Sequence, residues 1–130
     1  MTTKKDKTIV LIDRNESVRG LTHTFLVNAG YTNVHDFGSI SDSIESVWGY
    51  DPALVICDAG DSAREEKEVL DFIRDMRKDG IKVPFLIASV GMTETDKPES
   101  VWELGGEVLR KPFAQEKLLH EVERLINLPY

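Results

Sequence analysis

The chain has 130 residues, a length that suggests one domain, residues 1–130, built around a single hydrophobic core. Hydrophobic residues make up 41% of it and charged residues 30%, which is ordinary for a globular protein in water. The formal net charge of −7 argues against direct contacts with nucleic acid or with an anionic membrane surface. The one positive cluster, Lys4, Lys5 and Lys7, falls in residues 1–7, which we expect to form a flexible N-terminal tail.

The sequence contains no candidate membrane anchor and no pair of cysteines. No apolar run approaches the roughly 18 residues that a membrane span needs, and the first residues lack the apolar core of a secretory signal. Cys57 is the single cysteine, so an intrachain disulfide is excluded. These features lead us to expect a cytoplasmic protein.

Strand patterns and helix patterns alternate along the chain. Ile9 to Ile12 is a continuous apolar run, mostly β-branched, which is typical of a strand covered on both faces. From Val18 to Ala29 the apolar residues recur every three or four positions, which predicts a helix that ends at Gly30.

The later elements continue this alternation. They are predicted, in chain order, as a strand over Asn33 to Phe37, a helix over Ser41 to Trp48, a strand over Pro52 to Asp58, a helix over Glu66 to Lys78, a strand over Val83 to Ser89, a helix over Pro98 to Leu104, a strand over Glu107 to Arg110 and a helix over Gln115 to Ile126. Five such pairs predict an α/β fold in which helices cover both faces of a doubly wound, five-stranded parallel sheet.

Polar side chains stand where four of the predicted strands end. They are Asp13, Asp58, Ser89 and Lys111. The carboxyl ends of the strands form the ligand crevice of such a sheet, so we expect these side chains to meet. Two neighbouring carboxylates repel each other unless a cation lies between them, and their oxygens suit Mg²⁺. A carboxylate can also attack a phosphoryl group, whose oxygens a hydroxyl and an ammonium group can bind.

Four segments in this order resemble the receiver domain of two-component response regulators, and the likeness covers essentially the whole chain. The segments are VLIDRNESVR, DPALVICD, VPFLIAS and RKPF. The resemblance implies a flavodoxin-like, CheY-like three-layer sandwich. It also implies a signalling switch rather than an enzyme, which takes a phosphoryl group from a sensor histidine kinase or a phosphotransfer protein in a phosphorelay.

The resemblance assigns a role to each matching position. Asp58 matches the phospho-acceptor, and Asp13 matches one of the two paired metal-binding acids. The backbone carbonyl of Gly60 would face a Mg²⁺ ion. Ser89 matches the hydroxyl that turns toward the phosphoryl group, and Lys111 matches the lysine that binds its oxygen. In the family, the bond between this lysine and the proline after it is usually cis.

The resemblance also implies where the signal leaves the domain. Receivers respond by shifting the loops and helices around the fourth and fifth strands. We therefore expect a downstream protein, or a second copy in a homodimer, to bind the face of the fourth helix, fifth strand and fifth helix. Trp102 lies on that fourth helix; it is interpreted as a core residue or, where exposed, as an extension of the face.

Arg14 departs from the family pattern, because a second acid that binds Mg²⁺ usually stands there. At about 4 Å and an effective dielectric of about 20, one unit-charge pair is worth on the order of 4 kcal/mol. An arginine that points inward would therefore weaken or abolish Mg²⁺ binding. It can instead hold its head in water, form a bidentate pair with Asp58 or Asp13, or bind an incoming phosphate. The bidentate pair would make the chain a pseudo-receiver, an interaction module independent of phosphorylation.

Two smaller departures concern access and readout. Val90 follows Ser89 where a small alanine is common, so access to Asp58 is expected to be narrower. Val108 takes the position that an aromatic residue often holds, so a readout through the rotamer of an aromatic side chain is not expected.

Overall fold

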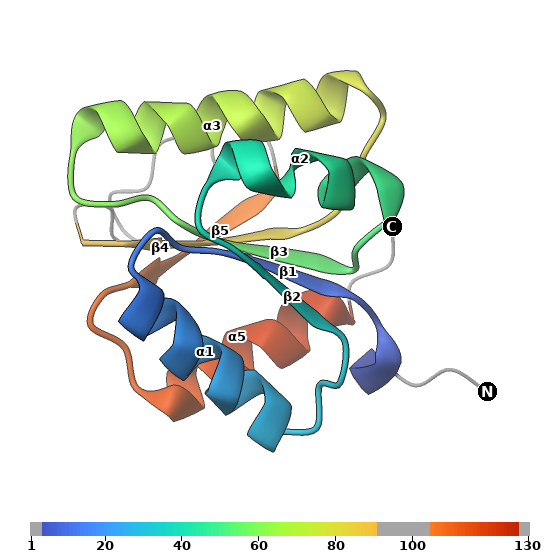
Figure 1. Cartoon of the computed structure of the whole chain (residues 1–130), viewed down its shortest axis with the longest axis vertical. Helices are drawn as coiled ribbons and strands as arrows, with labels where there is room; N and C mark the ends of the chain where they lie inside the picture. Colours follow the sequence, from blue (N-terminus) through green and yellow to red (C-terminus); the bar gives the residue numbers. More distant parts are fainter. Residues whose placement is uncertain (1–3, 91–104, 128–130) are drawn as a thin grey trace.

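The computed structural model describes residues 4–90 and 105–127, which form a three-layer α/β sandwich (Figure 1). The strands are β1 (Ile9–Ile12), β2 (Val34–Phe37), β3 (Leu54–Asp58), β4 (Phe85–Ser89) and β5 (Gly106–Arg110). The helices are α1 (Glu16–Asn28), α2 (Ile40–Gly49), α3 (Ala63–Lys78) and α5 (Gln115–Ile126), preceded by the 3₁₀ helix η1 (Lys4–Asp6). The helix predicted over Pro98 to Leu104, with Trp102, lies outside the described residues.

The five strands form one parallel sheet in the order β2-β1-β3-β4-β5. Helices α2 and α3 cover one face of the sheet, and α1 and α5 cover the other (Figure 1). This is the flavodoxin-like doubly wound order, and it confirms the predicted fold class. The chain changes its winding direction between β1 and β3, and a crevice forms outside the carboxyl ends of the strands at such a point.

The apolar strands supply both hydrophobic cores at once. Val10 and Ile12 of β1 belong to the core that packs against α2 and α3, whereas Ile9 and Leu11 belong to the core against α1 and α5. Successive strand side chains point to opposite faces of the sheet, so a strand that is covered on both faces must be apolar throughout. All four residues are buried, which confirms the prediction made from the continuous run.

Helix α3 begins at Ala63, before the predicted start at Glu66, so that predicted boundary was wrong. Ser62 caps the helix: its hydroxyl oxygen accepts a hydrogen bond from the Glu65 amide at 3.2 Å and its hydroxyl donates to Glu65 Oε1 at 3.2 Å. A serine followed by a glutamate three residues later is the sequence signature of a capping box, although here the glutamate accepts from the Ser62 hydroxyl and not from its backbone amide. The early start places Glu65 and Glu68 in the first turns of α3, beside the strand ends.

Within the tail expected over residues 1–7, the described residues include the short helix η1 (Lys4–Asp6). Lys5 Nζ donates to the Ala29 carbonyl at 2.5 Å and lies 5.6 Å from the centre of the Tyr31 ring. The Thr32 amide donates to the Lys5 carbonyl at 3.2 Å. Lys5 therefore ties η1 to the turn that follows α1.

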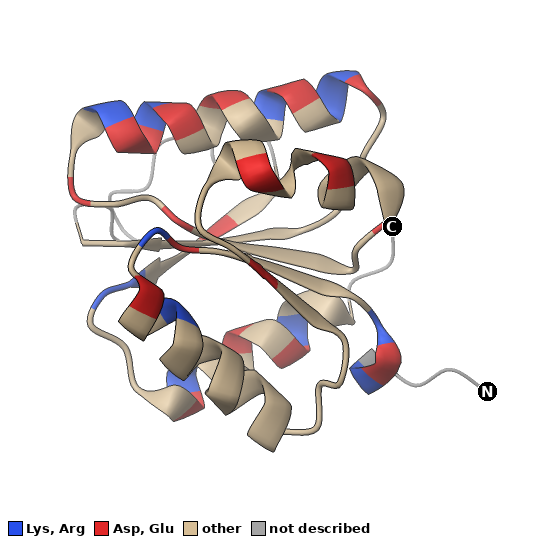
Figure 2. Ribbon diagram, viewed as in Figure 1, with Lys and Arg blue, Asp and Glu red and all other residues tan. Residues whose placement is uncertain are grey.

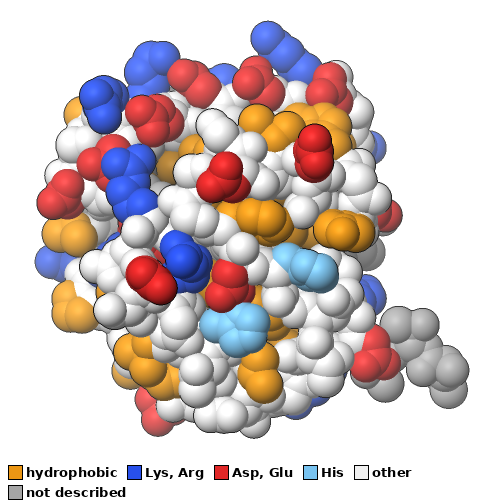
Figure 3. Space-filling model, in the orientation of Figure 1, with side chains coloured by type: hydrophobic (Ala, Val, Ile, Leu, Met, Phe, Trp, Pro, Cys, Tyr) orange, Lys and Arg blue, Asp and Glu red, His pale blue; other side chains and the backbone are white. Residues whose placement is uncertain are grey.

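The outward surface of α3 carries charges of both signs, as the ribbon diagram and the space-filling view show (Figures 2 and 3). Ion pairs join neighbouring turns there; the Lys67 ammonium lies 2.8 Å from Asp71 Oδ2. Such a surface suits a helix whose opposite side packs on the sheet. None of the helices in the described part of the chain is long and apolar enough to cross a membrane.

Helix α1 offers a matched test of the packing. We expect Leu26→Ala to lower the free energy of unfolding by about 2–5 kcal/mol, since Leu26 is fully buried and its removal leaves a cavity. Leu21→Ala on the same helix should change it by less than about 0.5 kcal/mol, because that side chain is 54% exposed. Urea unfolding of both variants measures the difference, and equal losses would contradict the arrangement of α1.

Candidate functional site

Asp58 and Lys111 meet at the carboxyl edge of the sheet. Asp58 is the last residue of β3, and Lys111 follows β5 directly. The Lys111 ammonium donates a hydrogen bond to Asp58 Oδ1 across the end of β4. The two side chains are only 8% and 21% exposed, so little water screens the pair. The Lys111–Pro112 peptide bond is cis, as the resemblance implied.

Asp13 lies at the end of β1, one strand away from Asp58, and is buried. Its Oδ1 accepts a hydrogen bond from the Asn15 amide at 2.9 Å, and Asn15 in turn caps α1 by accepting from the Val18 amide at 3.0 Å. Burial raises the pKa of Asp13 above its ordinary value, and the Asp58 carboxylate adds to this rise against the opposing Asn15 hydrogen bond. The Asp58 carboxylate is thus close enough to disfavour the charge of Asp13.

Ser89 stands at the same edge. It is the last residue of β4, one position beyond Ala88, which pairs with Asp58 in the sheet. Its side chain is fully buried, and its carbonyl accepts a hydrogen bond from the Lys111 amide at 2.9 Å. The backbone of Ser89 therefore lies at the strand edge next to Asp58 and Lys111, while the approach of its hydroxyl to Asp58 and its role toward a phosphoryl group stay predictions.

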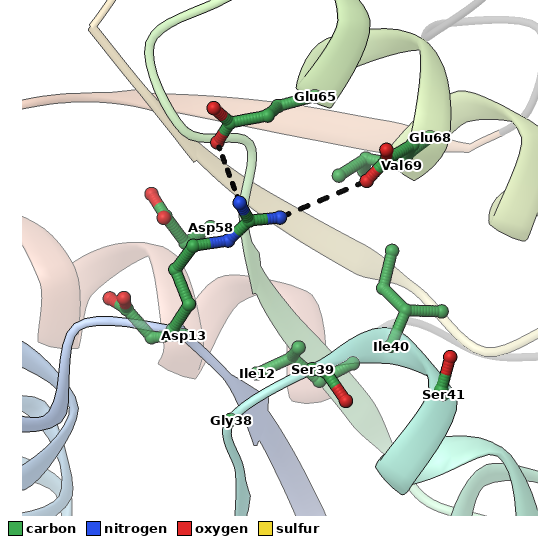
Figure 4. A pocket seen from close by; sticks show the side chains of 11 residues that line it. Ile12, Asp13, Gly38, Ser39, Ile40, Ser41, Asp58, Glu65, Glu68 and Val69 are labelled. Atoms are coloured by element: carbon green, nitrogen blue, oxygen red, sulfur yellow. Dashed lines mark ion pairs between the residues drawn. The ribbon is translucent and has the colours of Figure 1, made fainter.

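Arg14 does not pair with either site carboxylate. Its side chain is 60% exposed, and its guanidinium lies 3.9 Å from Glu65 Oε2 and 3.8 Å from Glu68 Oε2, the two ion pairs drawn in Figure 4. Both partners belong to α3. Of the three interpretations of Arg14, the bidentate pair with Asp58 or Asp13 is the one that this geometry contradicts.

Asp58 lines a pocket of about 130 Å³ between the strand ends, the start of α2 and the start of α3 (Figure 4). Its ionisable lining residues are Asp13, Arg14, Asp58, Glu65 and Glu68. Neither glutamate was among the residues predicted for the site. The capping-box spacing from Ser62 was the signal that would have placed Glu65 at this end of α3.

The backbone conformation at position 60 and the nearby Glu65 carboxylate both favour glycine there. Its φ of +67° lies in the left-handed region, and a Cβ atom there would stand 1.5 Å from Glu65 Oε2. The Glu65 carboxylate therefore fills the space that a side chain at position 60 would need. Glu65, from α3, therefore lies against the loop that follows Asp58.

The donor set fits Mg²⁺ incompletely. Asp13, Asp58 and the Gly60 carbonyl are oxygen donors of the kind that Mg²⁺ takes, but Lys111 already occupies an oxygen of Asp58, and Arg14 beside Asp13 is a cation and not an oxygen donor. Within residues 4–90 and 105–127, no three Asp, Glu, His or Cys side chains are arranged to hold a metal ion. The described side chains therefore do not form a complete Mg²⁺ site.

Val90 and Val108 lie away from this pocket. Val108 is buried in β5, in the core under α3. Val90 is 54% exposed and lines a separate apolar groove together with Phe25 and Phe113. The lining of the Asp58 pocket does not include Val90, but the groove of Val90 includes Lys111, so the expected effect of Val90 on access to Asp58 stays a prediction.

The conformation at Gly60 can be tested against a second glycine. Gly60→Ala should lower the free energy of unfolding by about 1–2 kcal/mol, because alanine disfavours this φ and its methyl group displaces Glu65. Gly20→Ala, on an open position of α1, should raise it by about 0.5–1 kcal/mol. Chemical denaturation measures both, and shifts in the same direction would contradict the loop geometry.

The raised pKa of Asp13 predicts a pH-dependent stability. Ionised Asp13 costs more in the folded state than in the unfolded state, so wild-type stability falls as the pH rises from the ordinary value, 3.8, through the folded pKa. Asp13→Asn keeps an oxygen for the Asn15 amide and should stabilise the protein at pH 7. This gain should vanish below pH 3.8, where both states are protonated. Urea unfolding across this pH range measures the difference in free energy of unfolding between Asp13→Asn and the wild type, with Asp61→Asn at an exposed position as the control. A gain in stability that persists in acid would contradict the raised pKa of Asp13.

Comparisons with known proteins support the fold. No family model and no curated protein sequence matches the chain. Many solved structures do match. A response regulator from Thermotoga maritima is 20% identical with a TM-score of 0.78, over 95% of this chain and 99% of that one. The chemotaxis response regulator CheY4 of Vibrio cholerae is 20% identical with a TM-score of 0.76, over 92% and 98%.

A third match, the receiver domain of the Francisella response regulator 1452, is 17% identical with a TM-score of 0.76, over 93% of this chain and 97% of that one. All three matches run over nearly the full length of both chains. With the strand order and the helix layers described above, they show that this chain has the fold of a response regulator receiver domain, the CheY-like fold.

Proposed function

We propose that this chain is a receiver domain that accepts a phosphoryl group on Asp58 and signals by changing conformation. The observation that carries the proposal is the contact of the Lys111 ammonium with the Asp58 carboxylate, at the end of a parallel sheet with Asp13 alongside. A lysine in this place can hold an oxygen of a phosphoryl group on Asp58. Ser89, one residue beyond the sheet partner of Asp58, is the hydroxyl proposed to bind a second oxygen.

The outward position of Arg14 favours this function over a frozen module. A bidentate arginine on Asp58 would block the carboxylate that must attack phosphorus. The Arg14 guanidinium is instead engaged by Glu65 and Glu68 on α3. The nucleophilic carboxylate therefore keeps the lysine as its cationic partner.

The donor and the output of the switch follow from the same proposal. The donor is a sensor histidine kinase or a phosphotransfer protein in the cytoplasm, and the role is signalling rather than turnover of a substrate. The output is contact with a downstream protein, or with a second copy, through a face that includes β5 and α5. The helix proposed to complete this face lies outside the described residues.

One observation favours a second candidate, the pseudo-receiver. Arg14 stands where a metal-binding acid is usual, and the described side chains do not form a complete Mg²⁺ site. A domain that cannot bind the metal can still present the receiver fold to a protein partner. In that case its contacts would not depend on phosphorylation of Asp58.

Intact-protein mass spectrometry separates the two candidates. After incubation with acetyl phosphate and Mg²⁺, we expect the wild-type chain to gain the mass of one phosphoryl group. Asp58→Asn should gain none, because an amide oxygen is a poor nucleophile. Asp61→Asn, the same substitution at an exposed neighbouring aspartate, should behave as the wild type does. No gain in the wild type or in an Arg14→Asp variant would favour the pseudo-receiver instead.

A further inference from the structure

Arg14 is held at the mouth of the Asp58 pocket by weak contacts. Its nitrogens lie 3.9 and 3.8 Å from the oxygens of Glu65 and Glu68, beyond hydrogen-bond distance. The arginine side chain is 60% exposed, and that of Glu68 is 47% exposed. Exposed ion pairs of this geometry contribute little to stability, so the guanidinium can exchange partners at small cost.

Among the described residues that line the pocket of Asp58, Arg14 is the one cation, and the other ionisable side chains are acids (Figure 4). Lys111 contacts Asp58 at the strand end, and Arg14 and Asp58 line the same pocket. The proposed phospho-acceptor therefore has one cation in contact and a second cation in the lining of its pocket. A group that adds negative charge to Asp58 would be attracted to both of them.

We propose that Arg14 releases Glu65 and Glu68 when Asp58 is phosphorylated and binds the phosphoryl oxygens, supplying in this chain the positive charge that the incomplete metal site lacks. This inference rests on the proposed function and deepens it. A guanidinium presents a planar fork of N–H donors that matches two phosphoryl oxygens, and it stays charged at any physiological pH. Phosphorylation of Asp58 is then independent of a divalent cation.

The charges favour this exchange of partners. Before transfer, Arg14 faces two carboxylates of one charge each. Phosphorylation replaces the single negative charge of the Asp58 carboxylate with about two on the phosphoryl group, and it adds three acceptor oxygens to the pocket. The same charge repels Glu65, whose carboxylate stands over Gly60 beside Asp58. Both effects move Arg14 from α3 toward Asp58.

The chemical step is balanced without a metal or a proton. A carboxylate oxygen of Asp58 forms a bond to the phosphorus of an acyl phosphate, and the bond from phosphorus to the donor oxygen breaks. The leaving carboxylate, acetate when the donor is acetyl phosphate, keeps that electron pair. Lys111 and Arg14 bind oxygens of the transferring group and take no part in bond making.

A neighbouring arginine supplies the matched control. Arg64 also pairs with Glu68, at 3.7 Å, but its side chain is 81% exposed and it does not line the pocket. The test compares the rate of phosphorylation by acetyl phosphate in the wild type, Arg14→Gln, Arg64→Gln and Arg14→Asp. Each is followed by intact mass in Mg²⁺ and in EDTA, after thermal unfolding has established that each variant folds.

We expect the wild type and Arg64→Gln to be phosphorylated at comparable rates in Mg²⁺ and in EDTA. Arg14→Gln should be about tenfold to a hundredfold slower in EDTA, the loss expected for a hydrogen-bonded charge. Arg14→Asp, which restores a second acid, should react only with Mg²⁺.

One result would overturn this inference and leave the proposed function standing. In it, phosphorylation of Asp58 needs Mg²⁺ in the wild type, and its rate is the same in Arg14→Gln. A wild-type chain that gains no phosphoryl group in either condition, or gains one that Asp58→Asn retains, would overturn the proposed function and this inference together. The two failures are therefore distinguishable in one set of measurements.

Discussion

The contact between Lys111 and Asp58 depends on three strands keeping their register. It joins the ends of β3 and β5, which are separated by β4 in the sheet. The pairing of Asp58 with Ala88, and of Ser89 with Arg110, sets how far each strand end reaches. A slip of one residue would move a strand end by about 3.3 Å and turn its side chains to the opposite face. The relative position of Lys111 and Asp58 therefore depends on how the sheet is packed.

The packing that secures this register comes from both sides. Strand residues alternate between a core under α2 and α3 and a core under α1 and α5, and the strands next to Asp58 are buried on both faces. A polar group is tolerated at the strand ends because the sheet stops there and the loops begin. The polar side chains Asp13, Asp58 and Ser89 thus stand at the carboxyl edge of the sheet, where the buried strands end.

Acidic side chains dominate this edge of the sheet, and they differ in the polar partners that the surrounding structure gives them. Asp58 has the Lys111 ammonium, while Asp13 depends on the Asn15 amide and remains harder to ionise than a free aspartate. Arg14 adds a positive charge that Glu65 and Glu68 hold to one side. Added negative charge in this pocket would rearrange the ion pairs of Arg14, and the proposed phosphorylation of Asp58 would add such charge.

Most of the fold was predictable because the strand and helix signals are local. The apolar runs at Ile9 to Ile12 and at Leu54 to Cys57 report burial on two faces, and the polar residue after each run marks the strand end. The start of α3 was mispredicted although its capping-box signature, Ser62 and Glu65, is equally local. The contact of Lys5 with the turn after α1 had no local signal, since its partners lie more than twenty residues away.

The amino-acid sequence by itself determined the order of the elements and the residues that stand at the strand ends, because periodicity and polarity are properties of neighbouring residues. Only the tertiary structure decided which way Arg14 points and which acids surround it. Those acids, Glu65 and Glu68, come from a helix some fifty residues further along the chain. An arginine next to Asp13 has several charged groups within reach, and its partner depends on where α3 packs against the sheet, which no local pattern contains.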